Sequence, residues 1–172
     1  MTDLIAGISD NNVIGYNNDL PWRGFVPRDL PHFKEQTKDH DLIMGKITWL
    51  SIGSKPLPGR YCIIVSTTLD QVEDENYIIV PTFEYAYHIA KQRRKDISII
   101  GGSRLWKEAI ESNCIDRLLI TRIHGEFTGD AYFPIDIASE DKYYCVYKTK
   151  WKEISPNFSC TFELWLKKIT YP

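Results

Sequence analysis

The sequence lacks most of the features that mark secreted, membrane-embedded or metal-binding proteins. Its four cysteines are far apart and form no C-x-x-C pair, so we predict neither a disulfide framework nor a zinc site and expect reduced, packed thiols. The four histidines are equally scattered and form no ligand cluster. No apolar run approaches the length of a membrane span, and the first residues lack the basic and apolar regions of a signal peptide. We therefore expect a cytoplasmic protein that binds no metal.

A strong excess of charge is also absent. The formal net charge is −2, with 21 lysines and arginines against 23 acidic residues, so nothing favours nucleic acid or a membrane surface as a partner. The hydrophobic share of 43% and the charged share of 26% are ordinary for a globular protein. A chain of 172 residues has the usual size of one domain with a substantial core. We expect a single domain over residues 1–172 and a monomer, because no segment demands a partner.

Short apolar runs alternate with segments of helical spacing along most of the chain. Buried strands are predicted at residues 4–8, 41–44, 61–66, 77–80, 97–100 and 117–123. Helices are predicted at residues 27–37, from 45, at 82–91 with Thr82 as the cap, and from 103. After residue 123 two β-like runs, 143–152 and 159–168, flank a turn at 154–157 and predict a hairpin. Residues 126–134 read as a structured surface loop. This order predicts a mostly parallel sheet covered on both faces and closed by an antiparallel edge.

The stretch from residue 20 to residue 37 contains a carboxylate that packing alone does not explain. Pro27 suits the first turn of a helix, and Asp29 shares a helix face with Phe33, with Leu30 beside them. We expect this apolar face to be buried, and a buried carboxylate needs a partner or a raised pKa. The alternative is an acid that merely complements the helix dipole. The loop just before it, which contains Trp22, is either a lid over a pocket or an ordinary packed loop.

Glycine stands between a strand and a helix at two strand ends, in residues 44–48 and 100–104. Ligands of open α/β sheets bind beyond such ends, and glycine followed by a helix start lets free N–H groups approach a ligand. With Lys46 and Arg104 added, the two turns suit a ligand with two or more phosphates, such as a dinucleotide; ordinary turn chemistry is the alternative. No G-x-G-x-x-G is present, so the Rossmann fingerprint is absent. Arg60, after a proline-stiffened loop, either clamps a carboxylate or is simply exposed.

Taken together and in order, these signals resemble those of dihydrofolate reductases. The matching segments are Leu4-Ile5-Ala6, Val13-Ile14-Gly15, Leu20-Pro21-Trp22, Asp29-Leu30, Phe33-Lys34, Thr37, residues 43–46, Thr48-Trp49, Ser51-Ile52-Gly53, residues 56–60, Ile100-Gly101-Gly102, Thr121, and Gly129-Asp130 with Phe133-Pro134. The resemblance covers nearly the whole chain. It implies an α/β fold with an eight-stranded, mostly parallel sheet, flanking helices and an antiparallel C-terminal hairpin.

The resemblance also implies an activity. Such enzymes reduce 7,8-dihydrofolate to tetrahydrofolate with NADPH, by hydride transfer to C6 and protonation of N5, and so support one-carbon metabolism and thymidylate synthesis. Antifolates such as methotrexate are expected ligands. Two alternative functions are a reductase of similar fold that acts on a ribosylated aminopyrimidine in riboflavin synthesis, and a non-catalytic pterin- or nucleotide-binding protein. The substrate of the first carries a phosphate, so that enzyme has less use for Arg60 and Asp29. The presence of Asp29, Trp22 and Thr121 argues against the second.

The family resemblance implies roles for the residues at matching positions. Asp29 looks like the acid that binds the pterin and promotes protonation of N5, and residues 13–22 look like the mobile loop over the nicotinamide. The implied catalytic residues are Asp29, Trp22, Leu20 and Thr121. The implied substrate-binding residues are Ile5, Ala6, Asp29, Phe33, Lys34, Ser51, Ile52, Lys55, Leu57, Arg60, Ile100 and Thr121, with Arg60 as the clamp for the glutamate α-carboxylate. The implied NADPH-binding residues are Ala6, Ile14, Gly15, Leu20, Gly45, Lys46, Thr48, Ser66, Thr67, Ile100, Gly101, Gly102, Ser103, Arg104, Leu105 and Trp106, with Lys46 and Thr67 at the 2′-phosphate.

Two features depart from the family pattern. The loop between Trp22 and Asp29 is slightly longer than expected, which affects the rim of the predicted pocket. Trp106 stands where the family usually has tyrosine or phenylalanine beside the nicotinamide. A bulkier ring there would alter cofactor affinity or hydride geometry.

Overall fold

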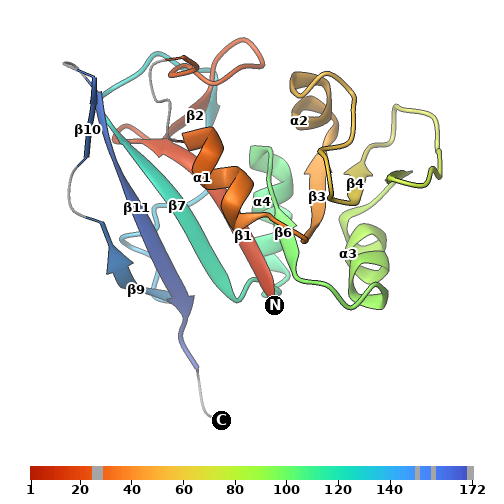
Figure 1. Cartoon of the computed structure of the whole chain (residues 1–172). Helices are drawn as coiled ribbons and strands as arrows, with labels where there is room; N and C mark the ends of the chain where they lie inside the picture. The colour runs from red at the N-terminus through yellow and green to blue at the C-terminus, as the bar shows by residue number, and fades with distance from the viewer. Residues whose placement is uncertain (25–28, 150–151, 156–157, 170–172) are drawn as a thin grey trace.

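A twisted sheet runs through the molecule and carries helices on both faces (Figure 1). The computed structural model describes residues 1–24, 29–149, 152–155 and 158–169. The parallel strands are β1 (Thr2–Ser9), β3 (Asp41–Gly45), β4 (Cys62–Val65), β5 (Tyr77–Val80), β6 (Ile97–Ile99) and β7 (Arg117–His124). The order across the sheet is β10-β11-β7-β1-β6-β3-β4-β5. The predicted mostly parallel architecture is therefore confirmed.

The antiparallel edge consists of β11 (Phe158–Lys167) with two shorter strands, β9 (Tyr143–Lys148) and β10 (Lys152–Ser155). Strand β10 pairs with the beginning of β11 and β9 with its end, so the two together occupy one position and the sheet is eight strands wide. The predicted C-terminal hairpin is confirmed. Residues 156–157 of its predicted turn lie outside the described residues.

The two halves of the sheet differ in strand length. Strands β1, β7 and β11 have 8, 8 and 10 residues. β1 lies beside β7 from Asp3 opposite Arg117 to Ser9 opposite Ile123. Strands β3, β4, β5 and β6 have only 3 to 5 residues each. Long ladders of backbone hydrogen bonds therefore join one half, and short ladders join the other.

In the described parts of the chain the sheet is covered by the helices α1 (Asp29–Gln36), α2 (Lys46–Ser51), α3 (Phe83–Gln92) and α4 (Ser103–Glu111). Alternate side chains of the strands point to opposite faces, so Ile43 packs with α3 and α4 in the largest core cluster, while Leu42 packs with α2. Thr82 caps α3 as predicted, because its side chain accepts a hydrogen bond from the Tyr85 amide. None of the helices in the described parts of the chain has the length and apolar character that a membrane crossing requires.

Three local predictions need correction or completion. The predicted start of α1 at Pro27 lies outside the described residues, and Leu30 is 57% exposed where a buried face was expected. The predicted loop at residues 126–134 contains a strand, β8 (Ala131–Tyr132), that pairs with β2 (Val13–Gly15). The cysteines are thiols, as expected, but Cys145 is exposed rather than packed.

Candidate active site

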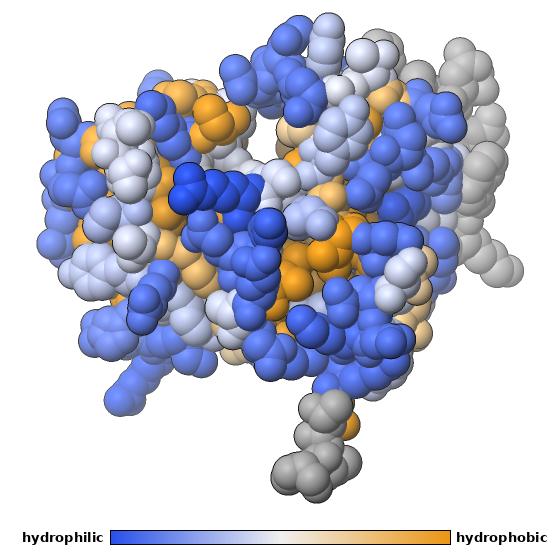
Figure 2. Space-filling view, turned by 180° about the vertical axis from the view of Figure 1, so that it is seen from behind, coloured by the Kyte–Doolittle hydropathy of each residue, from blue (hydrophilic) through white to orange (hydrophobic). Residues whose placement is uncertain are grey.

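A cleft of about 1180 Å³ opens at the carboxyl edge of the parallel strands. Helix α1 contributes to one wall and α2 to another, and residues of β1, β7 and the start of α4 line it as well. The space-filling view is notched at its upper margin between two raised parts (Figure 2). The position agrees with the expectation that ligands bind beyond the carboxyl ends of the strands.

The cleft brings together nearly all residues that the sequence suggested. Every residue expected to bind substrate or cofactor lines it except Lys55 and Gly101, and the Asp29 side chain lies outside the described part of the structure. Lys55 is exposed. Of the expected catalytic residues, Leu20 and Thr121 line the cleft and Trp22 does not.

Trp22 is a buried neighbour of the cleft. Its side chain is 1% exposed and packs with Ile123 and Cys160, and its ring meets Phe127 edge-on at 5.5 Å. The indole Nε1–H has no hydrogen-bond acceptor among the described residues. An unpaired buried donor is costly, so this N–H group needs an acceptor that the described side chains do not supply.

Arg60 is buried, which overturns the interpretation of an exposed side chain. It is 9% exposed, and its Nη1 donates a hydrogen bond of 2.8 Å to Thr37 Oγ1. Its Nε donates to the Pro58 carbonyl at 3.3 Å, and the guanidinium lies 5.9 Å from the Phe33 ring centre. Burial lowers the pKa of Arg60 from its ordinary value. The hydrogen-bond partners found in the described residues are neutral, so the wall of the cleft holds a desolvated cation that suits an anionic ligand.

The two glycine turns are joined directly. The Gly45 amide donates a 2.7 Å hydrogen bond to the Gly101 carbonyl, and the Gly101–Gly102 peptide bond is cis. Gly101 has a φ of 114°, and a Cβ there would lie 2.8 Å from Trp106 Cζ2. Only glycine fits this turn, so the surface just before α4 is formed by backbone rather than by a side chain.

A cation and several hydroxyl groups lie on the side of the cleft formed by α2 and the end of β4. Lys46 donates from Nζ to Thr68 Oγ1 at 2.7 Å. Ser66 Oγ accepts hydrogen bonds from the amides of Thr68 and Leu69. Ser66, Thr67 and Thr68 all line the cleft. This set of donors, with a glycine cradle nearby, fits the phosphates of a dinucleotide.

Residues 14–23 contribute to the lining of the cleft and are held from one side. Gly15 accepts a 3.0 Å hydrogen bond from the Asp130 amide, and Asp130 Oδ2 accepts one of 2.9 Å from the Asn17 amide. Asp19 forms an ion pair with Arg23. At Gly129 a Cβ would lie 2.2 Å from Val13 Cγ1, so the residue beside Asp130 must be small for this contact to form.

Several residues of the cleft were not identified from the sequence. Thr82 and Phe83 line it because β5 ends there and α3 begins, the same strand-to-helix geometry as at the glycine turns. Leu119 lines it two residues before Thr121, which alternation along β7 could have indicated. Thr68 belongs to a run of three hydroxyl residues, of which the family resemblance implies only Ser66 and Thr67 as cofactor-binding residues.

Comparisons with known proteins agree with this geometry. The family model for dihydrofolate reductase matches residues 1–167. The chain is 39% identical over 150 residues to the dihydrofolate reductase of Buchnera aphidicola subsp. Acyrthosiphon pisum, which covers 87% of this chain and 86% of that protein. It is 37% identical over 134 residues to the dihydrofolate reductase of Bacillus subtilis, a match that covers 78% of this chain and 76% of that protein.

A solved structure gives the same result. Dihydrofolate reductase from Enterococcus faecalis, complexed with NADP(H) and RAB-propyl, superposes with a TM-score of 0.85 at 28% identity and covers 98% of this chain and 97% of that one. The chain therefore belongs to the dihydrofolate reductase family, the NADPH-dependent enzymes that reduce 7,8-dihydrofolate to tetrahydrofolate.

Proposed function

We propose that the cleft binds dihydrofolate with its pterin ring beside Asp29 and its glutamate tail at Arg60. The observation that carries this orientation is the buried Arg60 guanidinium, whose bonds to Thr37 Oγ1 and the Pro58 carbonyl leave N–H groups for a ligand. A carboxylate that meets a planar guanidinium forms two parallel hydrogen bonds. Phe33, Ile52 and the neighbouring apolar side chains of the cleft would cover the flat middle of the substrate.

The cofactor would lie across the two glycine turns, with its 2′-phosphate at Lys46, Thr67 and Thr68. NADPH supplies the hydride, and the protein supplies proximity and a protected site. Leu20 and the chain before α1 would shield the reacting atoms from water. This placement is supported by the bond between Gly45 and Gly101 and by the cations beside it.

Proton supply is the remaining chemical task. N5 of dihydrofolate is too weakly basic to be mostly protonated at neutral pH, so a nearby carboxylate that raises its effective basicity accelerates the reaction. Asp29 would hold the ring and promote this protonation, with Thr121 and a water bound to the unpaired Trp22 N–H helping to orient it. Thr121 is buried in the cleft.

The test is Asp29→Asn. Hydride transfer at pH 7 should become much slower, and activity should partly recover as the pH falls, because solvent then protonates N5. Single-turnover rates from pH 5 to 9 measure this directly. A variant as fast as wild type at pH 7 would refute the assignment, and a slow rate with no recovery at low pH would show that the missing function is not proton supply.

Further expectations concern partners and location. We infer that the protein acts as a cytoplasmic monomer and binds methotrexate at the substrate site. Methotrexate carries both a diaminopteridine ring and a glutamate, so it would engage Asp29 and Arg60 together.

A further inference from the structure

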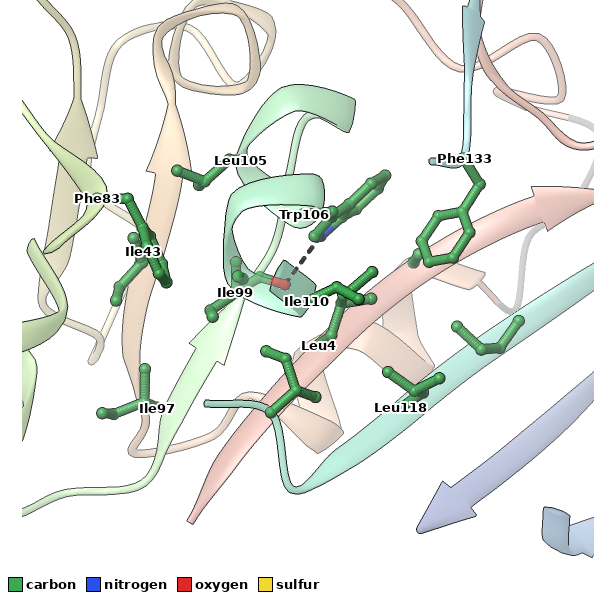
Figure 3. Packing of buried hydrophobic residues seen from close by; sticks show 14 of the residues in the cluster. Leu4, Ile43, Phe83, Ile97, Ile99, Leu105, Trp106, Ile110, Leu118 and Phe133 are labelled. Atoms are coloured by element: carbon green, nitrogen blue, oxygen red, sulfur yellow. Dashed lines mark hydrogen bonds between the residues drawn. The ribbon is translucent and has the colours of Figure 1, made fainter. Parts of the chain in front are cut away.

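Trp106 lies where the first turn of α4 meets the end of β6. Its side chain is 6% exposed, and its indole Nε1–H donates a 3.1 Å hydrogen bond to the Ile99 carbonyl. Figure 3 shows this bond and the Phe133 ring facing the indole; the two ring centres are 5.4 Å apart. The side chain therefore cannot rotate without breaking a buried hydrogen bond and leaving a ring contact.

The indole packs against the glycine turn on the side of Gly101 where a Cβ would stand. The position of a Cβ on Gly101 would lie 2.8 Å from Cζ2 and 3.2 Å from Cη2 and Cε2 of Trp106. The amide of Trp106 also donates to the Gly102 carbonyl at 3.0 Å. That last bond belongs to the backbone of α4 whatever the side chain, so the Trp106 indole itself holds the turn at Ile99 and Gly101.

The turn at Gly101 also holds the second glycine turn, at Gly45, on the other side of the proposed cofactor site. The Gly101 carbonyl accepts the hydrogen bond from the Gly45 amide, and Gly45 is the cap of α2. A shift of Gly101 would therefore move Gly45 or break a 2.7 Å hydrogen bond. Lys46, the next residue, would lose its alignment as well.

We propose that Trp106 is a positioning residue that sets the spacing of the two glycine turns and so the affinity for NADPH. The inference rests on the proposed placement of the cofactor across these turns. A smaller ring without an N–H group would leave the Ile99 carbonyl unpaired and open space beneath Gly101. The turns would then be held less firmly, and part of the binding free energy would be used to order them.

The first experiment compares Trp106→Phe with the matched variant Trp165→Phe. Trp165 is half-buried and donates from Nε1 to Glu163 at 3.0 Å, but it does not line the cleft. Isothermal titration should show NADPH binding to Trp106→Phe weakened about three- to tenfold, as expected for one buried hydrogen bond, while Trp165→Phe binds as wild type. A diaminopyrimidine without a glutamate should bind both variants within about twofold of wild type. Unchanged NADPH affinity in Trp106→Phe, or equal weakening in both variants, would overturn the proposal.

A second variant isolates the hydrogen bond and guards against misfolding. Incorporation of 3-benzothienylalanine at position 106 retains the two-ring shape and replaces the N–H group by sulfur. NADPH affinity should fall and the KM for NADPH should rise, with the KM for dihydrofolate unchanged. An analogue protein with wild-type NADPH affinity would show that the Ile99 bond does not position the turn.

The contact beneath Gly101 is tested by a double-mutant cycle. Gly101→Ala should weaken NADPH binding more than tenfold in the wild-type background, because its Cβ meets the indole and its φ is unfavourable. The loss should be at least about threefold smaller in Trp106→Phe, which lacks atoms at Cζ2 and Cη2. Additive losses would overturn the role of Trp106 while leaving the cofactor placement intact. No effect of Gly101→Ala in either background would refute the placement itself.

Discussion

Replacing Arg60 by methionine should separate the two ends of the substrate. Methionine keeps the unbranched, apolar stem of arginine but is shorter, and it offers no donor to a carboxylate. In the wild-type protein the Nη1 and Nε groups already bond to Thr37 Oγ1 and the Pro58 carbonyl. Of the five N–H groups of a guanidinium, three therefore remain for the glutamate of a ligand.

The expected loss follows from removing one partner of a desolvated charge pair. Such a truncation costs about 2–5 kcal/mol, which is roughly 30- to 4,000-fold in the dissociation constant of methotrexate. A diaminopyrimidine without a glutamate should bind within about twofold of wild type, because its ring contacts lie at the Asp29 end. Competitive titration of both ligands against the same NADPH complex measures the two effects.

Stability gives an independent check on Arg60. Burial lowers its pKa, so the free protein carries a charge that the fold disfavours. Arg60→Met removes this desolvated charge together with its bonds to Thr37 and Pro58, so we expect it to unfold in urea near the same concentration as wild type. Lys55→Met, an exposed lysine outside the cleft, is the matched control and should change neither affinity nor stability. Equal weakening of both ligands by Arg60→Met would show that Arg60 supports the fold, and no weakening of either would refute the clamp.

Two further changes test other parts of the molecule. Lys46→Ala should reduce the preference for NADPH over NADH, measured as the ratio of kcat/KM values, by at least about tenfold, since a charge-assisted hydrogen bond contributes about 1.5–3 kcal/mol. An unchanged ratio would show that the 2′-phosphate binds elsewhere. Burial raises the pKa of Tyr143 to about 12, above the value near 10 of the unfolded chain. The neutral Tyr143 side chain therefore contributes stability that is fully present below pH 10. As the pH rises to 12, the free energy of unfolding should fall by up to roughly 2.7 kcal/mol because of this residue. Urea unfolding of Tyr143→Phe should not show this part of the decrease.

The sequence predicted what depends on local pattern. The strand at Ile43 and the helix capped by Thr82 follow from apolar runs and a single hydroxyl, both of which act within a few residues. Lys46 and Arg104 could be placed at the cleft because strand ends of a parallel sheet meet at one edge.

What depends on distant partners could not be predicted. Arg60 is buried because Thr37, 23 residues earlier in the chain, accepts its hydrogen bond. Strand β8 has two residues, too few for a periodic pattern, and forms because β2 lies beside it. Leu30 is exposed although it sits in an apolar stretch, because its side of α1 lines a cleft rather than the core.

The unequal strand lengths have a consequence for hydrogen exchange. Amides in the long ladders of β1, β7 and β11 exchange only when most of the domain opens, so their protection reports global stability. The short strands β3 to β6 can open in smaller units, and the proposed cofactor site lies chiefly at their ends. NADPH would then slow exchange most in this half of the sheet, by raising the free energy of its local opening toward the global value.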